Sequence, residues 1–303
     1  MGVSERGPAQ ASSNRGAAPG TLFVVGTPIG NLGDLSQRAA ETLRSVHRVA
    51  AEDTRRTRAL LSHLGIVGVP VLRLDAQVVD RSLPRVLALL RAGHPVAMVT
   101  DAGMPSVSDP GSRLVHAAAE AGVPVVVVPG PSAVTAAVAA SGLVDGPFFF
   151  VGFLPRRGGK RVRVIERIAQ TGEPVVLFEA PNRTRTTLQE LAALMPDRAA
   201  VVCRELTKLH EEVARGRLSE LAARQQWRGE VTIVLGPSRA SADETATADA
   251  NDRLETRIRE LIAVGEPSKR IVAELARTTA LPRRVIYAQV QRLRGRMAAE
   301  RPG

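Results

Sequence analysis

Short apolar runs alternate with amphipathic segments along most of the chain, and this alternation restricts the possible folds more than any other feature. Runs such as TLFVV, PVAMVT and PVVVVPG have the length and composition of buried strands. The segments between them, such as LSQRAAETLRSV and SRLVHAAAEAG, repeat apolar residues at helical spacing. The sequence therefore predicts an α/β fold, with a parallel sheet covered by helices on its faces.

Changes in this pattern divide the chain into five parts. Residues 1–20 are rich in Gly, Ala, Ser and Pro and predict a disordered tail. We expect one α/β domain over 21–144 and a second, opened by FFFVGFLP, over 145–237. Residues 238–252 are polar and predict a linker. Residues 253–298 predict three short helices that resemble a helix-turn-helix unit, which could contact nucleic acid or only pack and dimerise. Their apolar positions are Leu254, Ile258, Leu261, Ile262, Ile271, Val272, Leu275, Ile286, Val290 and Leu293.

Charge and composition restrict the partners. The formal net charge of +11 attracts polyanions such as a nucleic-acid backbone, unless arginine only replaces lysine on an ordinary solvated surface. The single cysteine, Cys203, excludes a disulfide within the chain and suits a reducing compartment. No apolar run approaches the roughly 20 residues of a membrane span, and the N-terminal stretch lacks the apolar region of a secretory signal. We therefore expect a cytoplasmic protein with no membrane partner.

Unusual loops follow four of the predicted strands. They are GTPIGNLGD (26–34), EDTRRTR (52–58), TDAGMPSVSDPG (100–111) and PGPSAV (129–134). Ligands of parallel α/β sheets bind outside the carboxyl ends of the strands, where these loops should meet. The Asp101 carboxylate could accept hydrogen bonds from a ribose or an ammonium group, and Ser132 could bind a ligand or cap a helix. Each loop alone would be an ordinary turn, and GTPIGNLGD lacks the Gly-x-Gly-x2-Gly dinucleotide pattern, so only their joint placement predicts a site.

Several motifs together resemble a known family. GTPIGNLGDLSQRA, AEDTRRTRALL, VTDAGMPSVSDPG, VPGPSA, FEAPNR, CRELTKLHEE and GEVTIVLG are similar to those of the tetrapyrrole methylase superfamily, and within it to the small-subunit ribosomal RNA methyltransferase I family. The resemblance implies two α/β domains that hold S-adenosylmethionine in the cleft between them, and a homodimer. It also implies 2′-O-methylation of a cytidine in 16S rRNA of the small ribosomal subunit.

Carried over by motif, the resemblance assigns residues to the cofactor. Loops of the first domain would supply Pro28, Asp101, Gly103, Met104, Ser106, Ser132 and Ala133. The wall from the second domain would come from Phe178 to Pro181, with Phe178 and Ala180 foremost, and from Val231 and Thr232.

A ribose hydroxyl is a poor nucleophile, so a nearby base or cation should assist its attack on the methyl group. The candidates are Glu52, Glu205 and Lys208, from three polar clusters that also contain Asp53, Arg55, Glu179, Asn182, Arg183, Arg204 and His210. Structural ion pairs are the alternative explanation of these clusters. No His, Cys and carboxylate spacing predicts a metal site, and the displacement needs none.

Basic segments predict contacts to RNA. PRRGGKRVR (155–163) is expected to be a flexible cationic loop at the mouth of the cleft, or else a solvated hairpin tip. The expected RNA-contacting residues are Arg55, Arg56, Arg156, Arg157, Lys160, Arg161 and Arg183. Aromatic residues make up only 3% of the chain, which favours recognition of shape and phosphate over base stacking.

Two other functions stay open at this stage. The first is a small-molecule methyltransferase of the same superfamily, acting on a tetrapyrrole, because an acidic macrocycle would also bind arginine. The second is a non-enzymatic nucleic-acid-binding regulator that uses the three C-terminal helices. It predicts no cofactor binding.

Overall fold

The computed structural model describes residues 20–106, 111–238, 253–279 and 283–299. The chain divides into two compact units, Met1–Pro237 and Ser238–Gly303. Residues 1–19 and 239–252, which hold nearly all of the predicted tail and linker, lie outside the described residues.

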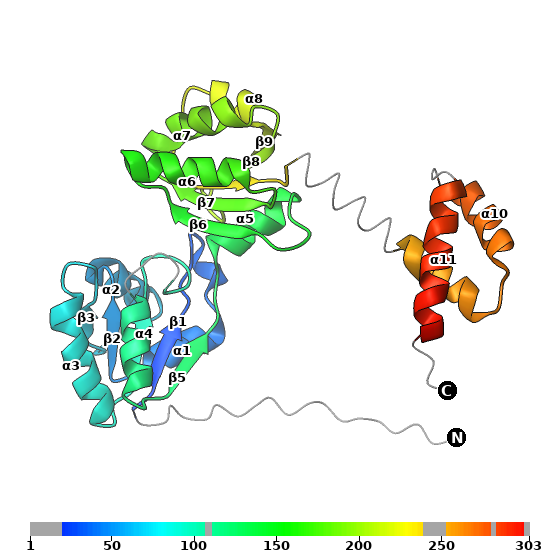
Figure 1. The fold of residues 1–303 in the computed structure, drawn as a ribbon. Coiled ribbons are helices and arrows are strands. Elements are labelled where there is room, and N and C mark those ends of the chain that lie inside the picture. The colour runs from blue at the N-terminus through cyan, green and yellow to red at the C-terminus, as the bar shows by residue number, and fades with distance from the viewer. Residues whose placement is uncertain (1–19, 107–110, 239–252, 280–282, 300–303) are drawn as a thin grey trace, which may run out of the picture. The chain divides into compact units, whose positions relative to one another are not determined.

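The first unit begins with a five-stranded parallel sheet of order β3-β2-β4-β1-β5 (Figure 1). Its strands are β1 (Leu22–Val25), β2 (Arg48–Ala51), β3 (Val71–Arg73), β4 (Val96–Val99) and β5 (Val125–Val128). The helices that follow them are η1 (Leu32–Asp34), α1 (Gln37–Ser45), α2 (Thr54–His63), α3 (Val79–Arg91) and α4 (Gly111–Glu120). The predicted parallel α/β architecture is thus confirmed.

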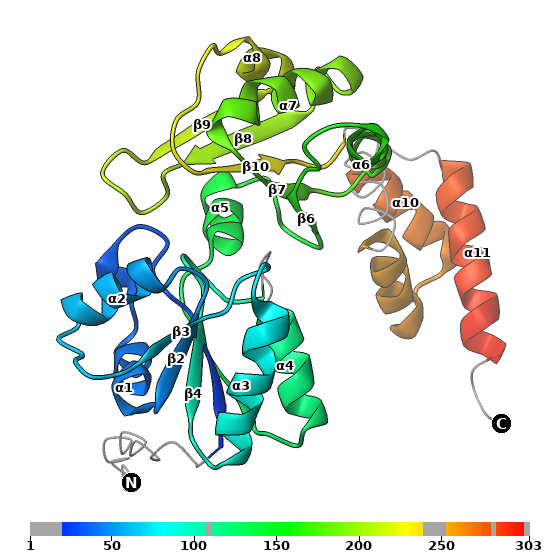
Figure 2. The ribbon, with the colours of Figure 1, turned by 90° about the vertical axis from the view of Figure 1, so that its left-hand side faces the viewer.

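Apolar residues alternate between the two faces of this sheet. Val24 and Met98 point to the face covered by α3 and α4, where they pack with Leu90 and Leu114. Their neighbours Val25 and Val99 point to the other face, where they pack with Leu43 of α1 and Leu61 of α2. Figure 2 shows these two pairs of helices on opposite sides of the sheet. Because the central strands β1 and β4 are covered on both faces, they are continuous apolar runs, which is why they could be recognised from the sequence.

The second sheet of this unit is mixed, with the order β6-β7-β10-β8-β9. Its strands are β6 (Phe149–Phe153), β7 (Val175–Glu179), β8 (Ala199–Arg204), β9 (Glu212–Arg217) and β10 (Val231–Leu235), and only β6 and β7 pair in parallel. The helices α6 (Gly159–Gln170), α7 (Pro181–Leu194) and α8 (Leu218–Ala223) cover one face. The strand β9 is not expected from the sequence, because EVARGR is a polar edge strand without an apolar run.

The helix α5 (Ala133–Ser141) covers the other face of the second sheet. Its Val134 and Ala137 pack against Val176, Val201 and Val234. The small side chains of SAVTAAVAASGL allow this close approach to the strands. The domain boundary drawn from the sequence at residue 144 therefore falls after a helix that packs with the second sheet.

The second unit is a three-helix arrangement, made of residues 253–263, α10 (Ser268–Thr278) and α11 (Arg283–Ala299). Every apolar position predicted for these helices is buried or packs against their common core. Many of the surface arginines are paired within the unit: Arg257 with Glu260 and Glu274, and Arg292 with Glu255. Across the described residues of the whole chain, no helix combines the length and apolar character that crossing a membrane requires.

Candidate functional site

Three loops of the first sheet are tied together where their strands end. The Thr27 N–H donates to the Gly103 carbonyl at 2.9 Å, and the Gly103 N–H donates back to Thr27 at 3.1 Å. Gly26 faces Gly130 so closely that a Cβ on Gly26 would lie 2.6 Å from the Gly130 Cα. Gly103 itself has a φ of 85°, in the left-handed region that favours glycine. The glycines of these loops thus allow the three backbone segments to pack closely against one another.

A cavity of about 410 Å³ opens beside these loops, between them and the carboxyl end of β7. We call it the first cavity. Its volume falls within the roughly 300–1,000 Å³ typical of small-molecule sites. It is lined by Ile29, Glu52, Arg56, Thr100, Asp101, Ala102, Gly103, Met104, Ser132, Ala133, Phe153, Phe178, Glu179, Ala180, Pro181, Glu230, Val231 and Thr232.

Two carboxylates give one wall of the first cavity its charge. Glu52 accepts a hydrogen bond from the Thr100 hydroxyl at 2.6 Å, and Asp101 accepts one from the Asp53 N–H at 2.9 Å. Burial and the nearby charge of Glu52 raise the pKa of Asp101, which the Asp53 N–H and Arg56 only partly offset. A pair of this kind favours a cationic ligand, because a bound positive charge would relieve the repulsion between the carboxylates.

The opposite wall is largely apolar. The Phe178 ring lies 5.4 Å from the Phe153 ring, centroid to centroid, and Val231 and Thr232 continue the surface. Ser132 occupies the N-cap position of α5, but its side chain makes no capping hydrogen bond. Ser132 lines the first cavity, which favours ligand contact over the capping role.

A second cavity of about 430 Å³ adjoins the first. The two share Ile29, Arg56, Thr100, Asp101, Ala102 and Glu230. Only the second cavity contains Pro28, His63 and Lys208. The Asp101 carboxylate, 3.5 Å from Arg56, therefore stands at the boundary of two adjoining spaces, each large enough for a small ligand.

Lys208 reaches the second cavity from the loop between β8 and β9. Its Nζ lies 2.9 Å from Glu205 and 3.2 Å from Glu230. Burial alone would lower the pKa of Lys208, but hydrogen bonds and charge attraction from both carboxylates outweigh it and raise that pKa. The Glu230 N–H and Lys208 in turn lower the pKa of Glu205. The pair is therefore fully ionised near neutral pH, with Lys208 a fixed cation.

The loop that carries Lys208 is strained and lies against the first sheet. Glu205 and Thr207 have φ values of 52° and 68°, which non-glycine residues rarely adopt. The Thr207 hydroxyl accepts a hydrogen bond from the Asn31 N–H at 3.0 Å. A Cβ on Gly30 would lie 2.4 Å from the Lys208 side chain, so a glycine there lets the lysine enter the second cavity. Such strain at a pocket is typical of functional loops.

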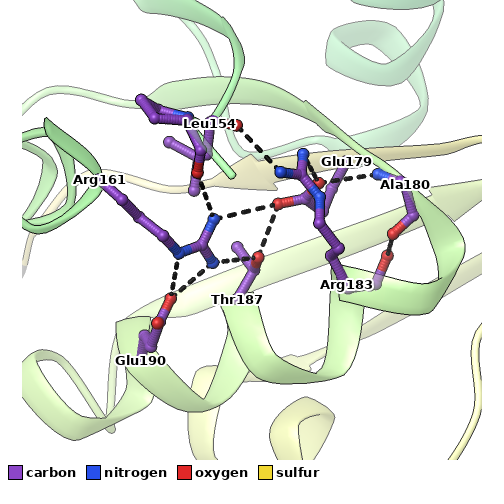
Figure 3. Close-up of polar contacts among 9 residues, drawn as sticks. Leu154, Arg161, Glu179, Ala180, Arg183, Thr187 and Glu190 are labelled. Carbon is purple, nitrogen blue, oxygen red and sulfur yellow. Dashed lines mark hydrogen bonds and ion pairs between the residues drawn. The ribbon is translucent and has the colours of Figure 1, made fainter. Parts of the chain in front are cut away.

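Glu179 anchors the second-sheet wall of the first cavity. Its side chain is fully buried and accepts hydrogen bonds from the Ala180 N–H at 2.8 Å and from the Thr187 hydroxyl at 2.7 Å. Arg161 and Arg183 both pair with the same carboxylate (Figure 3). Because every oxygen of Glu179 is engaged, this carboxylate fixes the start of α7 and the position of the Phe178–Pro181 segment.

Most of the cofactor residues predicted from the sequence come together. The first cavity holds Asp101, Gly103, Met104, Ser132, Ala133, Phe178, Ala180, Val231 and Thr232, as well as the catalytic candidate Glu52. Pro28 and Lys208 line the second cavity instead. Neither cavity includes Glu205, which contacts Lys208, or Ser106, which has a φ of 73°. Arg56 lines both cavities, while Arg55 is 89% exposed and pairs with Asp53.

The segment 155–163 differs from its prediction. From Gly159 onward it is the first turn of α6 and not a flexible loop, because the apolar residues Val164, Ile165 and Ile168 recur at helical spacing and pack into the core. Arg161 is buried and paired with Glu179 and Glu190, so its predicted exposure to RNA is wrong. Arg156, Arg157 and Lys160 are exposed.

Several residues that line the two cavities were not predicted individually from the sequence. They are Ile29, His63, Thr100, Ala102, Phe153 and Glu230. Phe153 and Glu230 stand next to the ends of predicted strands, which was an available signal. His63 could not be identified because it follows a strand by almost three helical turns. No group of three or more His, Cys, Asp or Glu within the described part of the chain is arranged to hold a metal ion.

Comparisons with known proteins extend this picture. The family model described as Tetrapyrrole (Corrin/Porphyrin) Methylases matches residues 21–222. Proteins named ribosomal RNA small subunit methyltransferase I are similar over most of the chain. The one from Micromonospora olivasterospora is 43% identical over 95% of this chain and 90% of its own length. The one from Bacillus subtilis is 36% identical over 92% of this chain and 96% of its own length. That from Thermotoga maritima is 44% identical over 71% of this chain and 98% of its own length.

Two solved structures share the fold. A diphthine synthase has a TM-score of 0.57 at 22% identity, and the match covers 71% of this chain and 89% of that one. A uroporphyrin-III-C-methyltransferase from Thermus thermophilus has a TM-score of 0.50 at 21% identity, over 72% and 94% of the two chains. At these identities the likeness concerns the fold alone.

Proposed function

The chain belongs to the tetrapyrrole methylase family, as its motifs predict, and from this premise we propose that it methylates RNA of the small ribosomal subunit. The donor would be S-adenosylmethionine and the acceptor the 2′-hydroxyl of a cytidine in 16S rRNA. The observation that carries the proposal is the pair of adjoining cavities that share Asp101. Transfer between two ligands requires two such spaces with a common boundary. The names of the relatives support ribosomal RNA as the acceptor.

The first cavity suits the donor. S-adenosylmethionine combines a flat apolar base with ammonium and sulfonium charges, and it supplies an electrophilic methyl group. Phe178 and Val231 offer an apolar wall, while Glu52 and Asp101 offer negative charge on the opposite side. The Ser132 hydroxyl and the backbone of Gly103 and Ala133 add polar contacts at the loops. The residues present therefore fit such a ligand.

The second cavity suits the acceptor. Its walls carry the cations Arg56 and Lys208, each paired with a carboxylate of the same cavity, Asp101 or Glu230, so the cavity offers both charged donors and acceptors to a nucleotide. The Thr100 and Asp101 backbone separates this space from the first cavity. A ribose held here could direct its hydroxyl toward the shared boundary, on the side of the methyl group away from sulfur.

We assign the proton of the attacking hydroxyl to the carboxylate pair Glu52 and Asp101. A general base works best when its pKa approaches the operating pH, and the raised pKa of Asp101 moves in that direction. Lys208 stays protonated and so stabilises developing negative charge on the hydroxyl oxygen and is not the base. Glu205 is a positioning residue, because it holds the Lys208 ammonium at 2.9 Å without lining either cavity.

The cellular setting follows from the substrate. A ribosomal RNA methyltransferase of this kind would act in the cytoplasm.

The family resemblance also implies a homodimer, and large apolar side chains are available for an interface: Val127, Phe149 and Phe153 are 51%, 48% and 57% exposed. Size-exclusion chromatography with light scattering tests this part of the proposal, because a monomer at micromolar concentration would contradict it.

The activity itself is tested with methyl-labelled S-adenosylmethionine and isolated small ribosomal subunits that lack the modification. We expect label in 16S rRNA with wild-type protein and none with the Asp101→Ala variant. The absence of label from RNA, despite donor binding measured by calorimetry, would favour a small-molecule acceptor. The absence of donor binding would favour a non-enzymatic regulator.

A further inference from the structure

A third cavity, of about 300 Å³, lies between the starts of α6 and α7. We call it the α6–α7 groove. It is separate from the two cavities described above and is lined by Arg156, Arg157, Gly158, Arg161, Val162, Asn182, Arg183, Thr186 and Glu190. Four of these nine residues are arginines and one is acidic, so the groove is strongly cationic.

The charges of the groove divide into an inner and an outer set. The inner arginines are compensated: Arg161 pairs with Glu179 and with Glu190 at 2.5 Å, and Arg183 pairs with Glu179 and donates to the Leu154 carbonyl at 3.2 Å (Figure 3). Two arginines are balanced there by two carboxylates, so the inner set carries no excess charge.

The outer set is not compensated. Arg156 and Arg157 are exposed, and within the described residues neither forms an ion pair. Their charge comes in addition to the positive end of α6, which begins at this groove after Gly158 without a side-chain cap. Arg156 and Arg157 thus place two unpaired guanidinium groups at the edge of the groove, beside inner arginines whose charge is already balanced.

The groove continues the wall of the first cavity. Phe153 and Pro181 line that cavity, whereas Arg156 and Asn182, a few residues further along the same segments, line the groove. Glu179 connects the two sites, because the residue lies in the wall of the first cavity and its buried carboxylate holds both inner arginines. An anion bound in the groove would therefore lie at the edge of the methyl-donor site and would be fixed relative to it.

We propose that the α6–α7 groove binds a backbone phosphate of the RNA substrate, with Arg156 and Arg157 as its charged ligands. The proposal rests on the proposed function. It states that the RNA backbone next to the reacting nucleotide passes over the α6–α7 groove. Arginine suits this task because its planar guanidinium donates two parallel hydrogen bonds to phosphate oxygens. Asn182 and Thr186 provide neutral polar contacts beside the charges. Arg161 belongs to the floor that positions the groove and does not contact RNA.

The test compares two double variants with the same change in charge. Arg156→Gln with Arg157→Gln removes the rim of the groove. Arg163→Gln with Arg167→Gln removes two exposed arginines of α6 that do not line the groove and form no ion pair among the described residues. Binding of unmodified small ribosomal subunits is measured by filter retention from 50 to 300 mM KCl, and S-adenosylmethionine affinity by calorimetry.

We expect the groove variant to bind subunits about tenfold more weakly at 100 mM KCl, with a salt slope reduced by about 0.7 for the one lost phosphate contact. The control variant should change affinity less than twofold, and both should keep wild-type donor affinity. Equal weakening in both variants, or in neither, would overturn the proposal. The proposed function is judged separately, by label transfer with the wild-type protein. Transfer by wild type together with unchanged subunit binding by the groove variant would reject the groove alone.

Discussion

The ammonium of Lys208 and the carboxylate of Glu205 form a hydrogen-bonded ion pair, Nζ to Oε1 2.9 Å, in a loop that packs against Gly30 of the first sheet. This pair raises the pKa of the lysine and lowers that of the glutamate, although burial acts against the first shift. Its stabilisation is therefore present throughout the neutral range. It is lost only as pH rises through the raised pKa of Lys208 or falls through the lowered pKa of Glu205.

The pair leads to a prediction for catalysis. Lys208→Met should lower kcat by about 10²-fold, because a fixed cation near the hydroxyl oxygen is lost, while donor affinity stays within twofold. Glu205→Gln should lower kcat less, since the lysine remains but is held less firmly. The pH–rate profile of the wild-type protein should therefore have no inflection between pH 7 and 9 that is due to Lys208. An inflection due to Lys208 would be present in the wild-type profile and absent from that of Lys208→Met. Such an inflection would assign Lys208 as the base and contradict our assignment.

Asp101 combines a functional role with a cost to the fold. Its raised pKa means that the ionised form is disfavoured in the folded protein; this cost is absent at pH below the ordinary value of 3.8 and is complete above the raised pKa. Asp101→Asn, which keeps an oxygen for the Asp53 N–H, should therefore have a Tm at pH 7 equal to or above that of wild type. Asp101→Ala should stay folded and lose donor binding. Calorimetric affinity within a few-fold of wild type would refute the assignment.

Glu52 offers a pH-dependent test of the carboxylate pair. Its charge is one of the causes that raise the pKa of Asp101, after burial. Glu52→Gln should therefore lower the pKa of Asp101 and move the acidic limb of the kcat/KM profile to lower pH, with a rate decrease of about 10- to 100-fold at pH 7.5. An unchanged acidic limb in this variant would show that Glu52 does not influence the group that accepts the proton.

The contact between Gly26 and Gly130 predicts a stability effect. A Cβ on Gly130 would lie 2.8 Å from the Gly26 Cα, with further backbone atoms within 3.0 Å. Gly130→Ala should cost about 1–3 kcal/mol in the free energy of unfolding, because backbone must move to relieve the overlap. Gly146→Ala is the matched control, since nothing lies within 4 Å of its Cβ position. Urea denaturation of both variants measures the difference, and equal midpoints would show that the loops adapt freely.

The helical unit is expected to serve the substrate and not the donor. Every residue of the two cavities lies within the first compact unit. The relative from Thermotoga maritima is matched over 98% of its length by only 71% of this chain, so it has little room for a further unit. Deletion of residues 250–303 should therefore spare donor affinity and weaken methylation of ribosomal subunits. Full activity of the shortened protein on subunits would exclude a contact between these helices and RNA.

The sequence allowed much of the lining of the first cavity to be predicted, because these residues stand near the ends of apolar strands. Asp101 lies two residues beyond the end of β4 and Ser132 four residues beyond the end of β5, and parallel strands bring their loops to one edge. The buried face of each C-terminal helix could be predicted because apolar residues recur at helical spacing within it, as Leu254, Ile258 and Leu261 do in the first.

Other features depend on contacts between segments that are distant in the sequence. The burial of Arg161 arises from Glu179 and Glu190 on different elements, and local composition only indicated a basic loop. The raised pKa of Lys208 depends on Glu205 and also on Glu230, which lies beyond an intervening strand and helix. The strand β9 escaped because a polar edge strand needs a partner, here β8, to supply its hydrogen bonds.

The central claim is tested most directly by locating the transferred methyl group. Purified protein is incubated with methyl-labelled S-adenosylmethionine and unmodified small ribosomal subunits, and the 16S rRNA is then digested with alkali and mapped. Our account predicts label at a single cytidine whose 3′ linkage resists alkali, as a 2′-O-methyl group requires. Label on a base, or at many positions, would contradict the proposed acceptor, and RNA without label would contradict ribosomal RNA as the substrate.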